Sequence, residues 1–289
     1  MENGILTGKK GIIFGALDSK SIAWKVAEYA KKEGAEIVLT NAPIALRMGT
    51  INELAKETNS IIVPADATNT EDLKNLFEKS MEHFRGKIDF VLHSIGMSVN
   101  VRKGKQYYEM NYDWTQKGMD VSAMSFHKTI KSAWDLDAIN DWGSIVGLSY
   151  IAAQRVFHSY NDMADNKALL ESIARSFGYH YGLKNKVRIN TISQSPTLTT
   201  AGSGVNGFDG FFKFADDLSP LGNASAEDCA NYCISLFSDY TRKITMQNLF
   251  HDGGFSSMGM SEKVMETYMN NIKNDWKIIF NKNELTDIY

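Results

Sequence analysis

The sequence predicts an α/β fold in which a doubly wound, parallel sheet is covered by helices on both faces. Short, almost wholly apolar runs alternate with longer stretches of helical periodicity from residue 11 to about residue 254. Such apolar runs are typical of strands buried on both faces, as parallel strands are. The chain has 289 residues, of which 43% are hydrophobic. This is long for one domain, but α/β folds reach such a size around one continuous core.

The expected elements follow one another without a repeat or a linker. Strands are expected at residues 11–16, 36–40, 60–66, 88–96, 143–150, 187–193 and 248–254. Helical stretches are expected near residues 21–33, 70–84, 115–135, 159–181 and 225–238. We therefore expect one domain over residues 1–256. Residues 257–289 are expected to form a C-terminal helical extension packed on or beside it.

Charge and composition exclude several classes of function. A formal net charge of −3 argues against nucleic acid as a partner. The N-terminal stretch lacks the apolar core of a secretory signal, and no apolar run approaches the ~18–20 residues of a membrane span. Cys229 and Cys233 lie four positions apart in an expected helix, which suits reduced thiols better than a disulfide framework or a metal site. We expect a soluble, cytoplasmic protein without a metal centre and without a membrane partner.

Small or polar residues follow four of the predicted strands, at the edge of a parallel sheet where ligands bind. Gly15 ends the first strand, and Ser21 stands where an N-cap would begin a helix. Free amides at such a helix start could bind a pyrophosphate, although a plain capped helix fits equally well. Asp66 could accept a hydrogen bond from an adenine amino group, or cap the helix near residue 70. Gly96 lets a ligand approach the backbone, or serves only as a turn glycine.

The segment after the second strand bears on the choice of dinucleotide. It lacks the acidic residue that usually binds the ribose 2′-hydroxyl of NAD, and it also lacks a basic cluster for a 2′-phosphate. Arg47 alone does not make such a cluster. NADH is favoured over NADPH by default.

Tyr160 and Lys167 lie seven positions apart within an expected helix, so they share one face, roughly 10 Å apart along the axis. A phenol and an ammonium in this arrangement could bracket one ligand. The spacing alone is a weak signal, because Tyr179 and Lys186 repeat it, interrupted by Gly182. Its significance depends on the motifs around it.

Those motifs resemble the enoyl-acyl-carrier-protein reductases of bacterial fatty-acid synthesis, a divergent branch of the short-chain dehydrogenase/reductases with a Rossmann-like sheet. The resemblance covers about residues 4–256. It rests on "GILTGKKGIIFG" with "SKSIA", on "HSIGM", on "LSYIAAQRVFHSYNDMADNKALLES", on "VRINTIS" and on "HDGGFS". Ordinary members of the wider group use Tyr-x3-Lys, whereas this branch uses Tyr-x6-Lys. Ala164 stands where the shorter spacing would need lysine.

The resemblance implies roles for individual residues. It assigns catalysis to Tyr150, Tyr160 and Lys167. It assigns the substrate to Ser98, Tyr150, Tyr160 and Met163. It assigns the cofactor to Gly15, Ser21, Ile22, Asp66, Ala67, Ser94, Ile95, Gly96, Lys167, Pro196, Thr197 and Thr199. In "SPTLT", however, Ser195 replaces the usual glycine and Thr197 the usual isoleucine.

The implied activity is the NADH-dependent reduction of the 2,3-trans double bond of enoyl-acyl-carrier-protein thioesters in fatty-acid elongation, with the acyl carrier protein as partner. One alternative is another short-chain reductase acting on a carbonyl. A second is a dinucleotide-binding regulator without turnover. A homotetramer is expected by analogy and because the helices at 115–135 and 159–181 carry apolar residues on more than one side. The alternative is that these helices lie deep in one core.

Residues 197–218 are expected to form a lid over the acyl chain. Glycines at 202, 204, 207 and 210 favour a mobile backbone, and Phe208, Phe211, Phe212 and Phe214 provide apolar surface. The alternative is a short helix packed permanently on the core. Lys213 is the only basic residue in this segment, whereas relatives often present several to the acidic carrier protein, so the docking site stays open.

Overall fold

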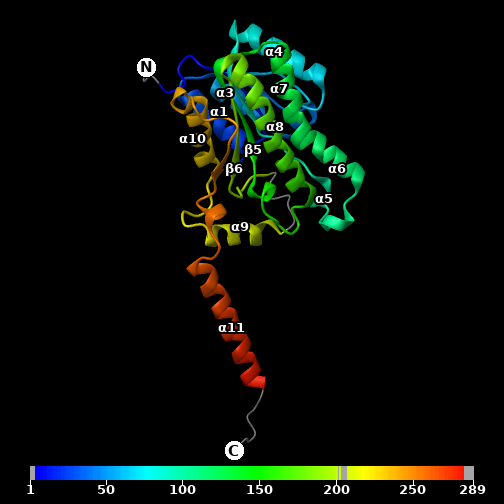
Figure 1. Ribbon diagram of the computed structural model, residues 1–289, viewed down its shortest axis with the longest axis vertical. Coiled ribbons are helices and arrows are strands. Elements are labelled where there is room, and N and C mark those ends of the chain that lie inside the picture. Colours follow the sequence, from blue (N-terminus) through cyan, green and yellow to red (C-terminus); the bar gives the residue numbers. More distant parts are fainter. Residues whose placement is uncertain (1–3, 201, 203–206, 283–289) are drawn as a thin grey trace, which may run out of the picture.

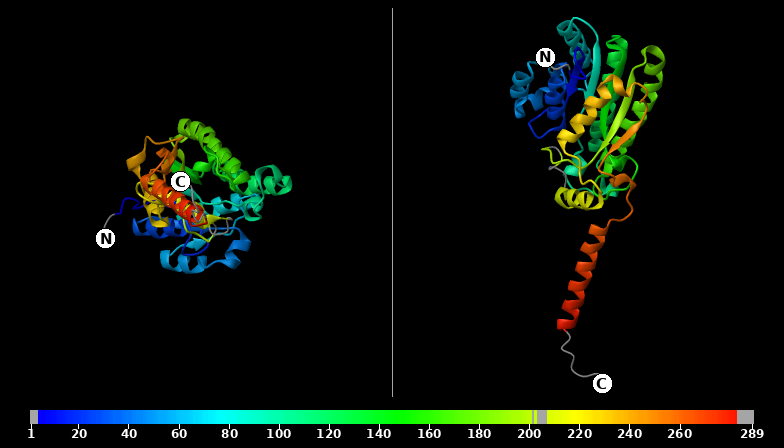
Figure 2. Two further views of the ribbon diagram at one scale, coloured as in Figure 1. Left: turned by 90° about the horizontal axis from the view of Figure 1, so that it is seen from below. Right: turned by 90° about the vertical axis from the view of Figure 1, so that its left-hand side faces the viewer.

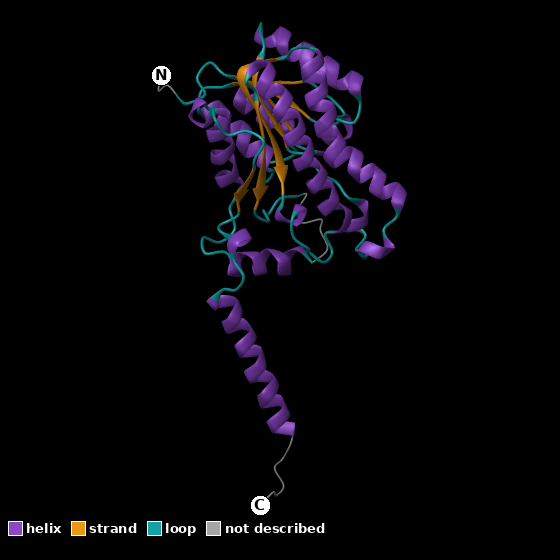
Figure 3. Ribbon diagram, viewed as in Figure 1, coloured by secondary structure: helices purple, strands orange, loops and turns teal. Residues whose placement is uncertain are grey.

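Seven parallel strands form one sheet at the centre of the chain (Figures 1 and 3). The computed structural model describes residues 4–200, 202 and 207–282, with side chains as far as residue 273. The strands are β1 (Lys10–Phe14), β2 (Glu36–Thr40), β3 (Ile61–Ile62), β4 (Ile88–His93), β5 (Ile139–Ser149), β6 (Arg188–Gln194) and β7 (Asn248–His251). Their order is β3-β2-β1-β4-β5-β6-β7, and every neighbouring pair is parallel. The predicted doubly wound fold is confirmed.

Helices cover both faces of the sheet, as Figure 2 shows. The helices are α1 (Ile22–Lys32), α2 (Pro43–Met48), α3 (Ile51–Thr58), α4 (Thr70–Phe84), α5 (Val99–Arg102), α6 (Tyr112–Met119), α7 (Ser125–Asp135), α8 (Asn161–Asn185), α9 (Phe208–Leu218), α10 (Ala226–Phe237) and α11 (Glu262–Lys282). A π-helical segment at Asp120–Met124 joins α6 to α7 without a break, so the helix expected at 115–135 is continuous and contains a π-helical segment.

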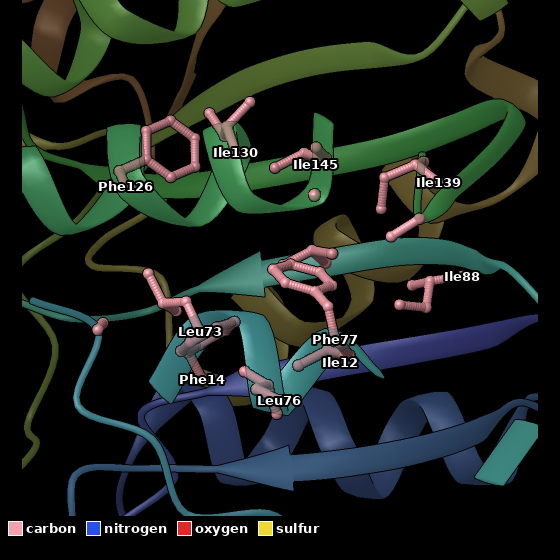
Figure 4. Close-up of a cluster of buried hydrophobic side chains, with 14 of the residues drawn as sticks. Ile12, Phe14, Leu73, Leu76, Phe77, Ile88, Phe126, Ile130, Ile139 and Ile145 are labelled. Atoms are coloured by element: carbon pink, nitrogen blue, oxygen red, sulfur yellow. The ribbon is translucent and has the colours of Figure 1, made fainter. Parts of the chain in front are cut away.

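Two hydrophobic clusters hold these layers together. In one, side chains of α4, α7 and α8 pack on one face of the sheet, where Phe77 and Phe126 are fully buried (Figure 4). In the other, α1, α3 and α10 pack on the opposite face, around Trp24 and Phe90. Successive strand residues point to opposite faces, so both sets must be apolar. Cys229 and Cys233 are buried free thiols in the second cluster.

Two differences from the expected elements have physical causes. The strand expected at 60–66 is regular only at Ile61–Ile62, because Pro64 has no N–H to donate to a ladder. Backbone bonds from Val63 to Leu39 and from Ala65 to Asn41 continue the extended chain. Residues 43–58, to which the sequence assigned no helix, contain α2 and α3, which are short.

The C-terminal extension begins against the domain and then leaves it (Figures 1 and 2). The Ser261 hydroxyl donates to the Asp217 carbonyl over 2.7 Å, and Lys263 forms an ion pair with the Asp217 carboxylate. Beyond this turn α11 extends away from the sheet and its helices. In the described part of the chain, no helix combines the length and the apolar character needed to span a bilayer. The same residues contain no cluster of three or more His, Cys, Asp or Glu side chains suited to a metal ion.

Candidate active site

A cleft of about 240 Å³ opens at the carboxyl ends of β4, β5 and β6, beside α8 and α9. Twelve predicted site residues line it, namely Ile22, Ser94, Ile95, Gly96, Ser98, Tyr150, Tyr160, Met163, Lys167, Pro196, Thr197 and Thr199. It is also lined by Met97, Val101, Arg102, Gln194, Phe208 and Phe211 among others. The strand-end rule therefore located the cleft.

Lys167 enters this cleft from the second turn of α8, whose N-cap is Tyr160. Its ammonium donates to the carbonyl of Leu148 at the end of β5, over 2.7 Å. Burial lowers the pKa of Lys167 to about 8, because the charged form loses hydration. Among the residues that the structure describes, this is the one hydrogen bond of the ammonium, and Lys167 is part of the cleft lining.

Glu171 lies one turn after Lys167 on α8 and is a buried carboxylate that the sequence did not single out. It accepts a hydrogen bond from Ser149 Oγ over 2.6 Å and one from Gln154 Nε2 over 3.3 Å. Its negative charge acts against burial and raises the pKa of Lys167. No local pattern marks Glu171 for this role, because Glu is common in helices.

Tyr150 and Tyr160 form an aromatic pair at the wall of the cleft, with ring centroids 5.1 Å apart. Tyr150 is 7% exposed, and its hydroxyl is buried without a hydrogen-bond partner among the described residues. Burial raises the pKa of both phenols above the ordinary value of tyrosine. Both are therefore neutral hydrogen-bond donors at physiological pH.

The loop after β1 has the backbone geometry that the sequence suggested. Gly15 has φ 95°, and a Cβ there would lie 2.1 Å from the Ser94 carbonyl oxygen, so only glycine fits. Ser21 is the N-cap residue of α1, but its hydroxyl donates to Asp18 O and accepts from Leu17 N instead of capping. The Ser21 side chain therefore makes no cap bond to α1, so it leaves the first amides, those of Ile22 and Ala23, open to a ligand.

Asp66 and Ala67 follow β3, and Gly15 and Ser21 follow β1. None of these four residues is among those that line the cleft. The Asp66 carboxylate accepts from the backbone N–H and the hydroxyl of Thr68 over 2.9 and 2.7 Å. The N-cap of α4 is Asn69, so the alternative that Asp66 caps this helix is wrong. Its contact with an adenine stays a prediction.

The two departures in "SPTLT" are built into a hydrogen-bonded loop. Ser195 Oγ accepts from the Ala224 N–H over 3.0 Å, and Thr197 Oγ1 donates to the Ser195 carbonyl over 3.0 Å. Gln194 Nε2 reaches Thr197 Oγ1 over 3.3 Å, while His251 Nδ1 donates to Gln194 Oε1 over 2.7 Å. These contacts hold the loop at the two positions that depart from the pattern quoted above.

The far side of the cleft is formed by α9. A second cavity of about 730 Å³ adjoins the first, with Tyr160 and Phe211 shared between them, and it is largely apolar. Phe157 and Phe211 make a T-shaped contact there, with centroids 5.5 Å apart. Residues 208–218 of the expected lid are helical, as the alternative had it. Residues 201 and 203–206, with the glycine at 204, lie outside the described residues.

The parallel sheet, with a cleft at its carboxyl edge, places the chain among the Rossmann-like α/β proteins. Residues 15–256 match the family model described as enoyl-(acyl carrier protein) reductase. The enoyl-[acyl-carrier-protein] reductase [NADH] FabI of Rickettsia felis is 32% identical over 91% of this chain and 100% of its own length. The chain belongs to the enoyl-(acyl carrier protein) reductase family.

Two solved structures extend this likeness. The crystal structure of a FabI–NADH complex from Alistipes finegoldii is 67% identical, covers 91% of this chain and 93% of its own, and has a TM-score of 0.90. The enoyl-[acyl-carrier-protein] reductase (NADH) of Aquifex aeolicus is 32% identical, covers 89% of this chain and 100% of its own, and has a TM-score of 0.82.

Proposed function

We propose that this protein is an NADH-dependent enoyl-acyl-carrier-protein reductase, which reduces the 2,3-trans double bond of an enoyl thioester in fatty-acid elongation. The observation that carries the proposal is the placement of Tyr160 and Lys167 in one cleft, next to an apolar cavity. The names of the relatives, which specify this reaction and NADH, support it.

The residues present fit a dinucleotide. Gly15 leaves room beside Ser94, the start of α1 offers uncapped amides, and Gly96 exposes backbone in the cleft. In this proposal Ser21 and Ile22 lie along the pyrophosphate, and Lys167 binds the nicotinamide ribose. Pro196, Thr197 and Thr199 border the carboxamide, and Asp66 and Ala67 border the adenine.

NADH, when bound, supplies a hydride to C3 of the enoyl thioester. Negative charge then develops on the thioester oxygen, and a proton taken up from water at C2 completes the reduction. The neutral phenol of Tyr160 donates a hydrogen bond to that oxygen, where it acts mainly on the rate. Tyr150 and Met163 line the acyl chain, and Ser98 borders the substrate. The ammonium of Lys167 adds a positive field.

A carbonyl reductase of the wider group would use a lysine four positions after the tyrosine. Ala164 occupies that position and packs with the aromatic cluster around Tyr150. A dinucleotide-binding regulator without turnover would need Lys167 for the cofactor, but it would not need the neutral phenol of Tyr160 at the wall of the cleft. Both alternatives are therefore disfavoured by the residues themselves.

The deciding experiment incubates the protein with NADH and a crotonyl thioester while the nicotinamide absorbance is followed. We expect loss of NADH matched by formation of the saturated thioester. Turnover of an acetoacetyl thioester in place of the crotonyl thioester would establish the carbonyl reductase. Binding of NADH with no turnover of either would establish the regulator.

Three finer features belong to the same proposal. The thioester reaches the enzyme on an acyl carrier protein, and the chain assembles as a homotetramer in the cytoplasm. Phe177 and Leu169 on α8 are only partly buried, which leaves apolar surface for a neighbouring subunit, whereas Phe126 on α7 is fully buried in its own core. We further propose that residues 1–256 form the catalytic domain and that residues 257–289 are an extension of it. Light scattering at micromolar concentration tests the assembly, and a monomer would contradict it.

A further inference from the structure

The cleft has two rims of opposite charge. One rim is α5 and the loop that follows it, residues 99–107, which contains Arg102, Lys103 and Lys105 and no acidic residue. The other is α9, which contains Asp209, Asp216 and Asp217 against the single cation Lys213, a net charge of −2 (one minus three). The chain as a whole has a net charge of −3, so the first rim is positive although the whole chain is negative.

The cation on α9 is neutralised within the chain. Lys213 pairs with the Asp217 carboxylate, which also pairs with Lys263 at the start of α11. On the opposite rim, by contrast, Arg102, Lys103 and Lys105 form no ion pair with any residue that the structure describes. The unpaired positive charge beside the cleft therefore lies on the 99–107 rim.

Aromatic side chains continue outwards from this rim, in a stretch that also contains Glu109 and Asp113. Tyr107, Tyr108 and Tyr112 are 58%, 85% and 80% exposed. Tyrosine and arginine are enriched at protein interfaces, and large amphipathic rings give contact area at low entropic cost. A charge run alone is usually just a solvated surface, so its position and its anchoring decide the interpretation.

The rim is fixed to the catalytic helix by hydrogen bonds, of which those to Asp162 are buried. The fully buried carboxylate of Asp162 on α8 accepts from Ser98 Oγ over 2.6 Å and from Asn100 Nδ2 over 2.9 Å. Asn161 donates from its side chain to the Lys105 carbonyl, and Tyr107 donates to Asp165 over 3.2 Å. The α8 residues in these bonds, Asn161, Asp162 and Asp165, lie between Tyr160 and Lys167 in the chain. These bonds therefore hold the rim at a fixed position relative to Tyr160 and Lys167.

We propose that residues 99–107 are the docking surface for the acidic carrier protein that delivers the thioester, and that α9 is not. The inference rests on the proposed function. Arg102 and Val101 line the cleft itself, so a thioester tethered to a partner on this rim enters directly beside Tyr160. An acidic partner is attracted by this rim and repelled by α9, which speeds the encounter and fixes its orientation.

The test compares two thioesters of the same crotonyl group, one on an acyl carrier protein and one on uncharged N-acetylcysteamine. The variant Lys103→Glu/Lys105→Glu reverses the rim charge without changing Arg102, which lines the cleft. The matched control is Lys56→Glu/Lys79→Glu, which reverses two exposed lysines on α3 and α4. The Lys213→Glu variant tests the rival surface on α9.

The rim variant should raise KM for the carrier-protein thioester about tenfold at low salt, with a smaller difference at high salt. Its kcat/KM for the N-acetylcysteamine thioester should stay within about twofold of wild type. In the control and in Lys213→Glu, this kcat/KM and the KM for the carrier-protein thioester should both stay within about twofold of wild type. An unchanged KM for the carrier-protein substrate, or a larger rise in Lys213→Glu, would overturn the proposal.

Two further outcomes are kept apart. If the rim variant loses activity on both substrates, the neutral Lys103→Gln/Lys105→Gln variant decides. A smaller, carrier-specific rise in KM supports docking, and an equal loss on both substrates refutes it. Failure of the wild type to reduce either thioester would instead refute the proposed function.

Discussion

The two walls of the cleft are built in different ways. The wall formed by the end of β5 and by α8 holds its ionisable groups buried, with Lys167 bonded to backbone and Glu171 bonded to Ser149. The wall formed by the loop after β6 and by α9 consists of small polar side chains bonded to one another, followed by phenylalanines. The contacts of the first wall hold individual ionisable side chains in place, whereas those of the second wall hold the backbone of the loop after β6 in place.

This difference explains which substitutions each wall tolerates. On the second wall Ser195 and Thr197 replace glycine and isoleucine, and their hydroxyls find partners in Ala224 and in Ser195 itself. On the first wall, a change in charge at Glu171 leaves a buried ammonium with less compensation, which is costly in a low dielectric. We therefore expect changes to the first wall to have the larger effects.

The largest effect is expected for Tyr160→Phe, which removes the donor aimed at the developing charge. Loss of one such donor costs about 2.7–4 kcal/mol, so kcat for the crotonyl thioester should fall by about 10²–10³ with a smaller change in KM. Steady-state kinetics measure both. Tyr179→Phe is the matched control, because Tyr179 belongs to the other Tyr-x6-Lys pair and is 56% exposed. Unchanged turnover in Tyr160→Phe would remove this phenol from the mechanism.

The next effect is expected for Lys167→Ala, which removes a charged donor from the proposed ribose site. Hydrogen bonds to charged groups contribute about 1.5–3 kcal/mol, so the Kd for NADH should rise about tenfold or more. Titration calorimetry measures this Kd, and Lys186→Ala from the second pair is the control. An NADH affinity equal to that of wild type would contradict the ribose role.

A third prediction concerns pH and separates Glu171 from Lys167. Lys167 has a pKa lowered to about 8, so it loses its proton, and NADH should bind more weakly, as the pH rises through this value. Glu171→Gln keeps a polar group beside Ser149 but removes the charge that raises the pKa of Lys167. The weakening should then begin at a lower pH than in wild type.

The measurement is the Kd for NADH as a function of pH in both proteins. His93 also lies within electrostatic range of Lys167, but burial lowers its pKa to about 3, so it stays neutral throughout this window. Superimposable pH profiles for wild type and Glu171→Gln would show that the carboxylate serves only the packing of Ser149 and Gln154.

The sequence predicted the parts of the molecule that have a local signal. The apolar strands are such parts, because burial on two faces produces a run of neighbouring apolar residues. The Tyr160–Lys167 pair is another, because helical spacing places both residues on one face of α8. α5 has only four residues and is held by Asp162, which is 62 positions from Asn100 in the chain. Such a contact leaves no local pattern, so the rim at 99–107 could be found only from the structure.

Glu171 and Gln194 illustrate the same limit on the two walls. A glutamate four residues after a lysine on a helix is usually a solvated pair, and only burial distinguishes this one. Gln194 directly precedes the loop that differs from the family pattern, yet its bond to His251 joins β6 to β7 across 57 positions. The polar residue at the strand end was visible, but its partner was not.

The smallest effect, and the sharpest test of the second wall, concerns α9 itself. Phe208 is buried, but Phe214 is 45% exposed and the helix begins after Gly207 with φ 74°. A helix that buries only Phe208, Ala215 and Leu218 opens more readily than α8, which buries ten residues. We expect amides 208–215 to exchange fast in the free protein and to slow when NAD and an enoyl-thioester analogue bind together, since the phenylalanines then close over the acyl chain. Hydrogen exchange with mass spectrometry measures this, with α8 as the internal reference that changes little. Equal protection of α9 in both states would mean that the second wall is as rigid as the first. The two walls would then differ only in the side chains that they bring to the cleft.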